Sequence, residues 1–126
     1  KFDHCLADLL YRYQSGELHC ELPIILSNHE DTRWLADAYH IPFQHLAVLK
    51  DGKEEAEKTQ LAILRDLKVD FLVLARYMQV LSADFIRHFP NHIINIHGEL
   101  FKVQVAVCIC EHIQTSFVKI ITYKQL

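Results

Sequence analysis

Hydrophobic positions along the chain follow two alternating patterns, one typical of helices and one typical of buried strands. Between residues 3 and 16 the apolar side chains are spaced three or four apart, which places them on one face of a helix. Asp3 is a suitable N-cap for that helix, and Gly16 stands where a C′ residue ends it. Residues 21–27 instead form a short, β-branched apolar run, which predicts a buried strand.

The same alternation continues along the chain. We predict helices over residues 28–39, 54–67 and 82–89, and strands over residues 44–49, 70–75 and 93–97. Ser82 is a suitable N-cap for the last of these helices. The expected inner face of the helix over 54–67 consists of Ala56, Leu61, Leu64 and Leu67. Helices that alternate with strands predict βαβ units. We therefore expect an α/β fold with a Rossmann-like, open, mostly parallel sheet and flanking helices.

Two parts of the pattern depart from a complete fold of this class. Such a sheet normally begins with a strand, whereas a helix comes first here, so we expect an incomplete fold with its first strand missing and the flank of a neighbouring strand exposed. Residues 101–110 and 116–123 both have strand character, which predicts a β-hairpin or a tail with strand propensity. We therefore divide the chain into an N-terminal part, residues 1–97, and a divergent strand-rich tail, residues 98–126.

Composition narrows the classes of function. The chain is 51% hydrophobic and 23% charged, as in ordinary globular proteins. Its net charge is −3 and its Lys and Arg are scattered, so we expect no nucleic-acid partner. We also expect no membrane partner, because the apolar runs are too short to span a bilayer. The four cysteines form no CxxC pair, and no signal peptide is evident, which together predict a reduced, cytoplasmic protein.

The strongest candidate for chemistry is the triplet Asn95-Ile96-His97 at the end of a predicted strand. Residues two apart on a strand share a face, so an amide and an imidazole would project together from the carboxyl end of a parallel strand. Ligands bind at that end in open α/β sheets. The amide could donate to an oxyanion and the imidazole could transfer a proton. The alternative is a polar strand end with a histidine that packs in the core.

A second candidate follows the strand over residues 70–75. The backbone of Gln79, Val80 and Leu81 would lie at the rim of the same cleft, where its polar groups could bind the edge of a flat heterocycle. The alternative is an ordinary connection between a strand and a helix.

The remaining motifs, and the absence of several known ones, argue against other kinds of functional site. Cys108, Cys110 and His112 would share a face if they lie on a strand, and such ligands can bind zinc. A fourth ligand has no evident source, so we expect no metal site. The sequence contains no GxGxxG, GxxxxGK[ST] or GxSxG motif, which disfavours dinucleotide binding, P-loop chemistry and a serine hydrolase.

Taken together, several segments resemble the formyltetrahydrofolate deformylase family. In matching order and spacing, these are residues 1–10, 25–29, 74–82 and 93–97. Glycinamide ribonucleotide formyltransferases share the fold and the Asn-Ile-His triplet. They differ in a Gly-rich first loop where this chain has Phe2–Cys5, and in Gly-Phe-Met-Arg where it has Arg76–Gln79. Both differences favour the deformylase.

The resemblance implies a reaction and roles for named residues. Water hydrolyses 10-formyltetrahydrofolate to tetrahydrofolate and formate, and the formate supplies purine synthesis and balances the one-carbon pool. Asn95 would donate to the oxyanion, and His97 would act as a proton donor or electrostatic stabiliser. The folate substrate would be bound by Met78, Gln79, Val80 and Leu81. No cofactor is implied.

The chain also departs from the family pattern. The family has an N-terminal regulatory ACT domain and a first strand that precede the matched region. It continues after the triplet with His-Ser-Phe-Leu-Pro and a catalytic Asp, whereas this chain has Gly98–Phe101 and no Asp after Asp84. Two alternatives therefore stay open. One is an inactive truncated fragment that self-associates through its exposed sheet edge as a homo-oligomer, and the other is a folate-dependent formyltransferase that acts on another amine.

Overall fold

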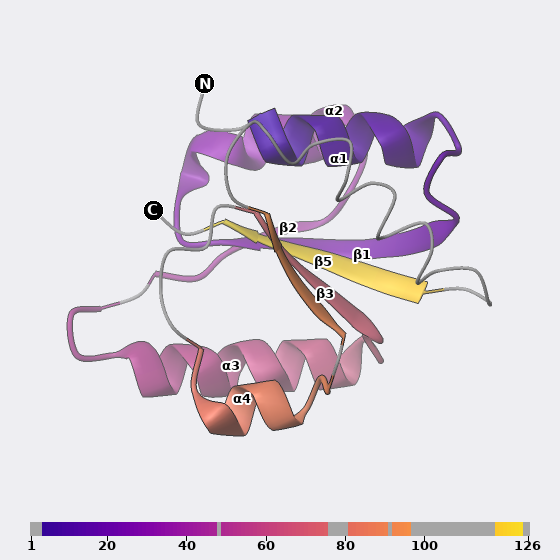
Figure 1. Cartoon of the computed structure of the whole chain (residues 1–126). Coiled ribbons are helices and arrows are strands. Elements are labelled where there is room, and N and C mark those ends of the chain that lie inside the picture. The colour runs from indigo at the N-terminus through magenta and orange to yellow at the C-terminus, as the bar shows by residue number, and fades with distance from the viewer. Residues whose placement is uncertain (1–3, 48, 76–80, 91, 97–117, 125–126) are drawn as a thin grey trace.

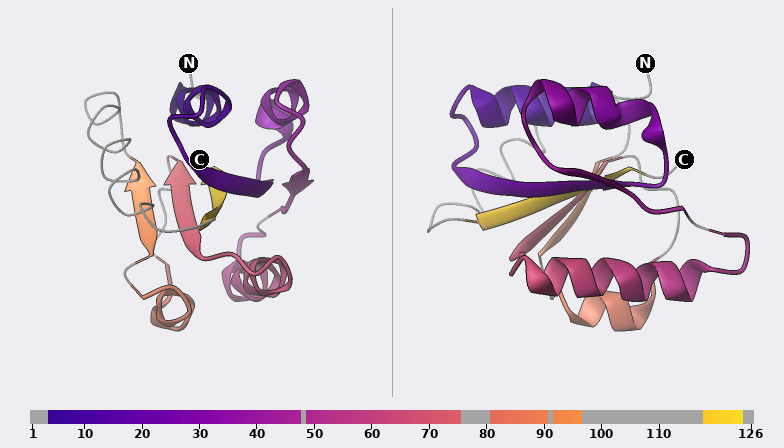
Figure 2. Two further views of the ribbon diagram at one scale, coloured as in Figure 1. Left: turned by 90° about the vertical axis from the view of Figure 1, so that its right-hand side faces the viewer. Right: turned by 180° about the vertical axis from the view of Figure 1, so that it is seen from behind.

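Parallel strands form one sheet between two layers of helices (Figure 1). The computed structural model describes residues 4–47, 49–75, 81–90, 92–96 and 118–124. Its helical elements are α1 (His4–Gln14), the 3₁₀ turn η1 (Glu30–Thr32), α2 (Arg33–Ala38), α3 (Lys53–Asp66) and α4 (Ala83–Arg87). Its strands are β1 (Cys20–Ser27), β2 (Phe43–His45), β3 (Phe71–Ala75), β4 (Ile93–Ile96) and β5 (Val118–Lys124). Helices α1 and α2 cover one face of the sheet, and α3 and α4 cover the other (Figure 2).

Among the described residues the predicted elements are confirmed, with two local differences, whereas the strand predicted over residues 101–110 lies outside them. The helix predicted over 28–39 is divided into η1 and α2, and the strand predicted over 44–49 is only the three residues of β2. Strand β2 stops early because its pairing with β1 ends where β1 ends. The last pair of that register is Ser27 with His45, and the amide of Leu46 then donates to the carbonyl of Ser27 at 2.8 Å.

Strand β5 occupies the centre of the sheet. The strand order is β2-β1-β5-β3-β4, and every pair is parallel (Figure 2). In the doubly wound order 3-2-1-4-5 that position belongs to the strand that precedes the first helix. The expected exposed flank is therefore wrong, because β5 pairs with both β1 and β3. The predicted hairpin with residues 101–110 is wrong too, since both hydrogen-bonding edges of β5 are occupied. The division at residue 97 stays a prediction.

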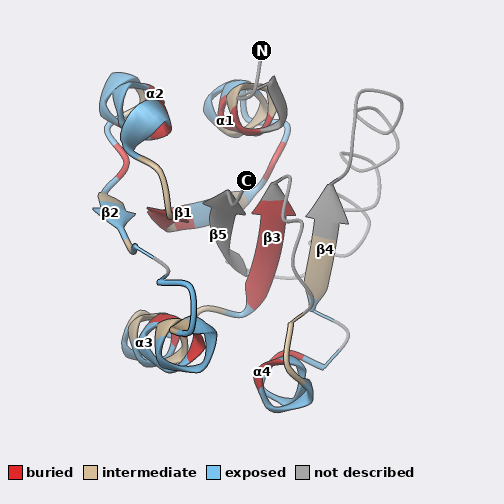
Figure 3. Cartoon of the chain, turned by 90° about the vertical axis from the view of Figure 1, so that its left-hand side faces the viewer, coloured by how far each residue is buried: buried red, intermediate tan, exposed pale blue. Residues whose placement is uncertain are grey.

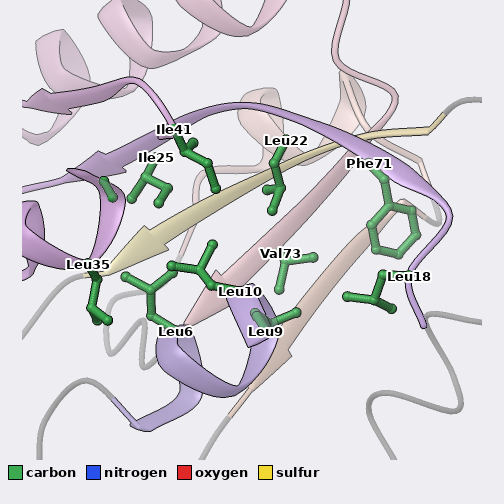
Figure 4. Close-up of a cluster of buried hydrophobic side chains, with 11 residues drawn as sticks. Leu6, Leu9, Leu10, Leu18, Leu22, Ile25, Leu35, Ile41, Phe71 and Val73 are labelled. Carbon is green, nitrogen blue, oxygen red and sulfur yellow. The ribbon is translucent and has the colours of Figure 1, made fainter. Parts of the chain in front are cut away.

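The face under α1 and α2 is closed by an apolar cluster, named here the α1–α2 cluster (Figure 4). Its buried members are Leu6, Leu9, Leu10, Leu18, Leu22, Ile25, Leu35, Ala36, Ile41, Phe71 and Val73. Leu6, Leu9 and Leu10 are the predicted inner face of α1. They pack on β3 residues that alternate with those facing the other layer.

The opposite face carries the α3–α4 cluster. Its buried members are Ile24, Leu26, Leu64, Leu72, Leu74, Phe85 and Phe89. Strand β1 contributes buried side chains to both clusters. Their alternation is irregular because the register of β1 with β5 shifts between Glu21 and Ile24. Pro23 lies within that shift. A proline has no N–H for a central ladder and is accommodated at bulges.

Three helices end in the same way. The residue after each C-cap has a positive φ: 85° at Gly16 after α1, 56° at His40 after α2 and 54° at Lys68 after α3. The amides around each of these residues donate back to carbonyls of the last helical turn, as in a Schellman motif. The prediction that Gly16 ends the first helix is confirmed. His40 and Lys68 adopt a conformation that glycine favours.

Candidate functional site

Because the strands are parallel, their carboxyl ends meet at one edge of the sheet. In Figure 3, β3 and β4 run upward side by side toward this edge. The register pairs Ala75, the last residue of β3, with Ile96 of β4 and Lys124 of β5. Asn95 is paired with Leu74 one step earlier. The sheet therefore brings Asn95 to the edge from which the connection to the predicted rim leaves β3.

The structure describes only part of the candidate site. It describes Asn95 in β4 and Leu81 ahead of α4, whereas Met78, Gln79, Val80 and His97 lie outside the described residues. Ile93, two residues before Asn95 on β4, packs against the α3–α4 cluster. The shared direction of the Asn95 amide and the His97 imidazole stays a prediction.

The segment Leu81–Ser82 is held by several contacts. Leu81 is half-buried and packs against the α3–α4 cluster. The Oγ of Ser82 accepts a hydrogen bond from the amide of Phe85 at 3.1 Å, which confirms Ser82 as the N-cap of α4. The amide of Ser82 donates to the Oε1 of Glu57 at 3.2 Å, which links this segment to α3.

A cavity of about 600 Å³ adjoins this segment. It lies between the N-terminal halves of α3 and α4, and its lining includes Glu57, Leu61 and Ser82. Its size falls within the range of small-molecule sites. The charged lining residues are Asp51, Lys53, Glu54, Glu57, Lys58 and Asp84, so the cavity has an excess of carboxylates. A hydrogen bond to Glu54, at an Nζ–Oε1 distance of 3.4 Å, raises the pKa of Lys58.

Sequence reasoning missed two buried polar residues of α3. Glu57 and Gln60 are 6% and 4% exposed. The predicted inner face is only partly right: Leu64 is buried, whereas Leu61 and Leu67 are partly buried and Ala56 is half-buried. The sequence signal that could have identified these two residues is their spacing from Leu64. Glu57 and Gln60 lie two turns and one turn before Leu64, on the same helical face.

The loop after β1 carries further polar groups at the same edge of the sheet. Asn28 Oδ1, His29 Nε2 and Thr32 Oγ1 are buried without a hydrogen-bond partner among the described residues. Sequence reasoning gave these residues no role, although polar residues directly after a buried parallel strand lie where ligands bind. Buried polar atoms of this kind are commonly satisfied by water or a ligand.

The described part of the chain has neither a metal cluster nor a membrane-spanning helix. No group of three or more His, Cys, Asp and Glu residues within it could hold a metal ion, and Cys108, Cys110 and His112 lie outside it. Cys20 is partly buried and packs against the α1–α2 cluster. None of the described helices combines the length and apolar character of a membrane span.

Comparison with known sequences gives a consistent result. A family model described as Formyl transferase matches residues 2–102. The formyltetrahydrofolate deformylase of Synechocystis sp. is 50% identical over 97 residues, which cover 77% of this chain and 34% of that protein. The formyltetrahydrofolate deformylase of Bacillus subtilis is 47% identical over 94 residues, which cover 75% of this chain and 31% of that protein. The chain thus spans about a third of the length of these relatives.

Solved structures agree with this assignment of the fold. Formyltetrahydrofolate deformylase from Burkholderia mallei superposes with a TM-score of 0.72 at 41% identity, over 75% of this chain and 34% of that one. Phosphoribosylglycinamide formyltransferase from Brucella melitensis superposes with a TM-score of 0.68 at 27% identity, over 86% of this chain and 62% of that one. The predicted Rossmann-like α/β class is confirmed.

Proposed function

Because the chain belongs to the formyl transferase family, we propose that it forms part of the site at which a deformylase hydrolyses 10-formyltetrahydrofolate to tetrahydrofolate and formate. The observation that carries this proposal is the position of Asn95. It lies at the carboxyl edge of the sheet, beside the end of β3 and the start of the connection to Leu81. The high identity to proteins named formyltetrahydrofolate deformylase supports the same substrate.

The proposed chemistry uses an amide and an imidazole. The oxygen of water attacks the formyl carbon, and the carbonyl oxygen becomes an oxyanion that accepts a hydrogen bond from the Asn95 amide. Water loses one proton as it attacks, the bond between this carbon and N10 then breaks, and N10 takes up a proton. The product leaves as formate once its remaining hydroxyl proton has passed to solvent. His97 stabilises the intermediate or supplies the proton that N10 takes up.

The substrate-binding part of the proposal concerns Met78, Gln79, Val80 and Leu81. Their backbone groups bind the edge of the pterin, a flat heterocycle with several donors and acceptors. The support comes from the C-terminal end of this segment, where Leu81 packs on the core and Ser82 is hydrogen-bonded to α3. A rim anchored at that end can present its backbone in a fixed direction.

Formate release from 10-formyltetrahydrofolate is the direct test. Formate release that needs no added amine would support the deformylase. Formyl transfer that requires an added amine would instead favour the transferase, to which the Brucella structure is a relative. Absence of both activities, together with association that depends on concentration, would favour the self-associating fragment.

The proposal also covers the cofactor requirement, the cellular location and the oligomeric state of the enzyme. Hydrolysis by water needs no cofactor, and we propose that it takes place in the cytoplasm. We also propose a homo-oligomer, although the sheet flank that first suggested one is filled by β5. Among the described strands, the outer edges of β2 and β4 are the ones left for a second copy. Sedimentation velocity at several concentrations tests this, and a monomer at all of them would contradict it.

A further inference from the structure

Glu57 is an acidic residue in a buried position. Its neighbours on α3, Glu54 and Glu55, have side chains that are 85% and 81% exposed, whereas Glu57 is 6% exposed. Burial of a carboxylate is costly unless hydrogen bonds or charges compensate it. The contacts of Glu57 therefore indicate why an acidic residue stands on the inner face of this helix.

The contact that explains this burial is made with the backbone of another element. Glu57 Oε1 accepts from the amide of Ser82 at 3.2 Å, across 25 positions of sequence. Ser82 is the N-cap of α4, and amides at a helix start have no carbonyl partner within the helix. Glu57 supplies that partner from α3.

Ser82 is consequently held from two sides. Its amide is bound by Glu57, and its Oγ binds the amide of Phe85, a residue that is 2% exposed in the α3–α4 cluster. Helix α4 has only five residues, and a helix this short depends on tertiary contacts for its stability. The position of Leu81, one residue earlier, is thereby set by α3.

We infer that Glu57 is a positioning residue for the backbone at Leu81, the described end of the segment proposed to bind the heterocycle: it fixes Leu81–Ser82 against α3, so that the backbone at Leu81 has one orientation when folate binds. This inference rests on the proposed function. Recognition of a flat ring by backbone groups requires those groups to be held within about 0.5 Å of their binding positions. The Glu57 carboxylate binds the amide of the N-cap residue Ser82. It can hold the backbone groups in this way without contacting the ligand.

A direct role for Glu57 makes a different prediction. Glu57 also lines the 600 Å³ cavity, where its carboxylate could bind a ligand itself. A positioning role needs only an acceptor atom at Oε1, which glutamine also provides. A direct role needs the negative charge. Glu57→Gln therefore separates the two, while Glu57→Ala and Glu57→Met both remove the acceptor, and Met keeps most of the side-chain volume.

The experiment combines two measurements on the whole chain. Amide hydrogen exchange, followed by NMR, reports the protection of Ser82. Titration with 5-formyltetrahydrofolate, a stable formylated folate, reports the dissociation constant. Gln60→Ala is the matched control, because Gln60 is a buried polar residue three positions further along the same helix. Circular dichroism selects the variant, Ala or Met, that retains the fold.

We expect loss of the acceptor to lower the protection of Ser82 and to weaken folate binding, each about tenfold. Glu57→Gln and Gln60→Ala should both stay within about threefold of the wild type. Unchanged protection of Ser82, or reduced protection with unchanged affinity, would overturn the inference. Loss of affinity in Glu57→Gln with Ser82 still protected would replace it with direct binding. A wild-type chain that binds no folate would refute the proposed function. It would also refute a role of Glu57 in folate binding, even if the exchange of the Ser82 amide showed that Glu57 links it to α3.

Discussion

The helices on the two faces of the sheet are held by different kinds of contact. The α1–α2 cluster consists of apolar side chains that fill the space between two helices and the sheet. The α3–α4 face also has an apolar cluster, but α3 adds the buried Glu57 and Gln60, and a cavity lies beside them. The first face closes the fold with contacts that have no direction, whereas the second uses directed hydrogen bonds next to the candidate site.

The difference shows how one small sheet can separate stability from positioning. Apolar contacts depend on volume and tolerate small shifts, so they are suited to holding layers together. A hydrogen bond to a backbone amide fixes a place and a direction. Substitutions on the first face should therefore alter stability most, and substitutions on the second face should alter ligand handling most.

The largest effect on stability is expected at the centre of the α1–α2 cluster. Leu10 is 0% exposed, and Leu10→Ala should lower the free energy of unfolding by about 3–5 kcal/mol, through lost transfer energy and a residual cavity. Urea denaturation measures this. Tyr11→Ala is the control, since Tyr11 is the next residue and is 61% exposed. An equal loss of unfolding free energy in both variants would mean that burial in the α1–α2 cluster does not determine the stability of the fold.

The largest effect on activity is expected at Asn95. Asn95→Ala should lower the rate of formate release about 100-fold, because an oxyanion donor is lost, with little change in thermal stability. A coupled assay for formate measures the rate. His19→Ala, at an exposed position before β1, should leave the rate unchanged. Unchanged turnover in Asn95→Ala would remove this residue from the mechanism.

A smaller effect is expected at the cap of α4. Ser82→Ala removes the Oγ that accepts from Phe85 and should lower the free energy of unfolding by about 1 kcal/mol. Ser82→Asn retains an acceptor at the N-cap and should recover most of the loss. Chemical denaturation of both variants decides this, and equal stabilities would show that the cap contributes nothing here.

A gain of stability is expected at the end of α3. Lys68 has a φ of 54°, and Lys68→Gly should relieve the crowding of its Cβ and raise the free energy of unfolding by about 0.5 kcal/mol. Lys68→Ala removes the same charge but keeps the Cβ, so it should bring no gain. Thermal unfolding of the pair measures the difference, and a gain in both variants would point to charge instead.

The smallest effect is expected at the exposed pair of Glu30 and Arg33. A hydrogen bond from Arg33, at an Nη2–Oε1 distance of 2.9 Å, lowers the pKa of Glu30 from its usual 4.5. A lowered pKa in the folded state stabilises the protein above about pH 4.5, and this contribution is lost as pH falls through the lowered value. The difference in Tm between wild type and Glu30→Gln should therefore shrink from pH 7 to pH 3. A constant difference would contradict the pairing.

Local structure was the most predictable part of the fold. The spacing of Leu6, Leu9 and Leu10 identified the buried face of α1, and the serine at position 82 identified the start of α4. These features depend on residues near one another in sequence, which interact in the same way in many proteins. The position of β5 was not predictable, because strand order is decided by which backbone edges remain unpaired and not by the pattern within a strand.

The candidate site was predictable only in outline. The triplet around Asn95 and the segment ending at Leu81 were identified, and the sheet brings their strands together at one edge. The role of Glu57 was missed because an acidic residue on a helix is expected to face water. Its burial depends on the amide of Ser82, which comes close only after α3 and α4 have packed on the sheet.

The central position of β5 also has a consequence for biosynthesis. A ribosome releases the β1–β2 and β3–β4 pairs before the strand that joins them, because β5 follows all other described strands in the chain. Until then, each pair has an open inner edge to which another nascent chain could add. Joining the pairs also closes a long loop, which slows folding. Chaperones that bind extended segments would therefore help this protein most before β5 has left the ribosome.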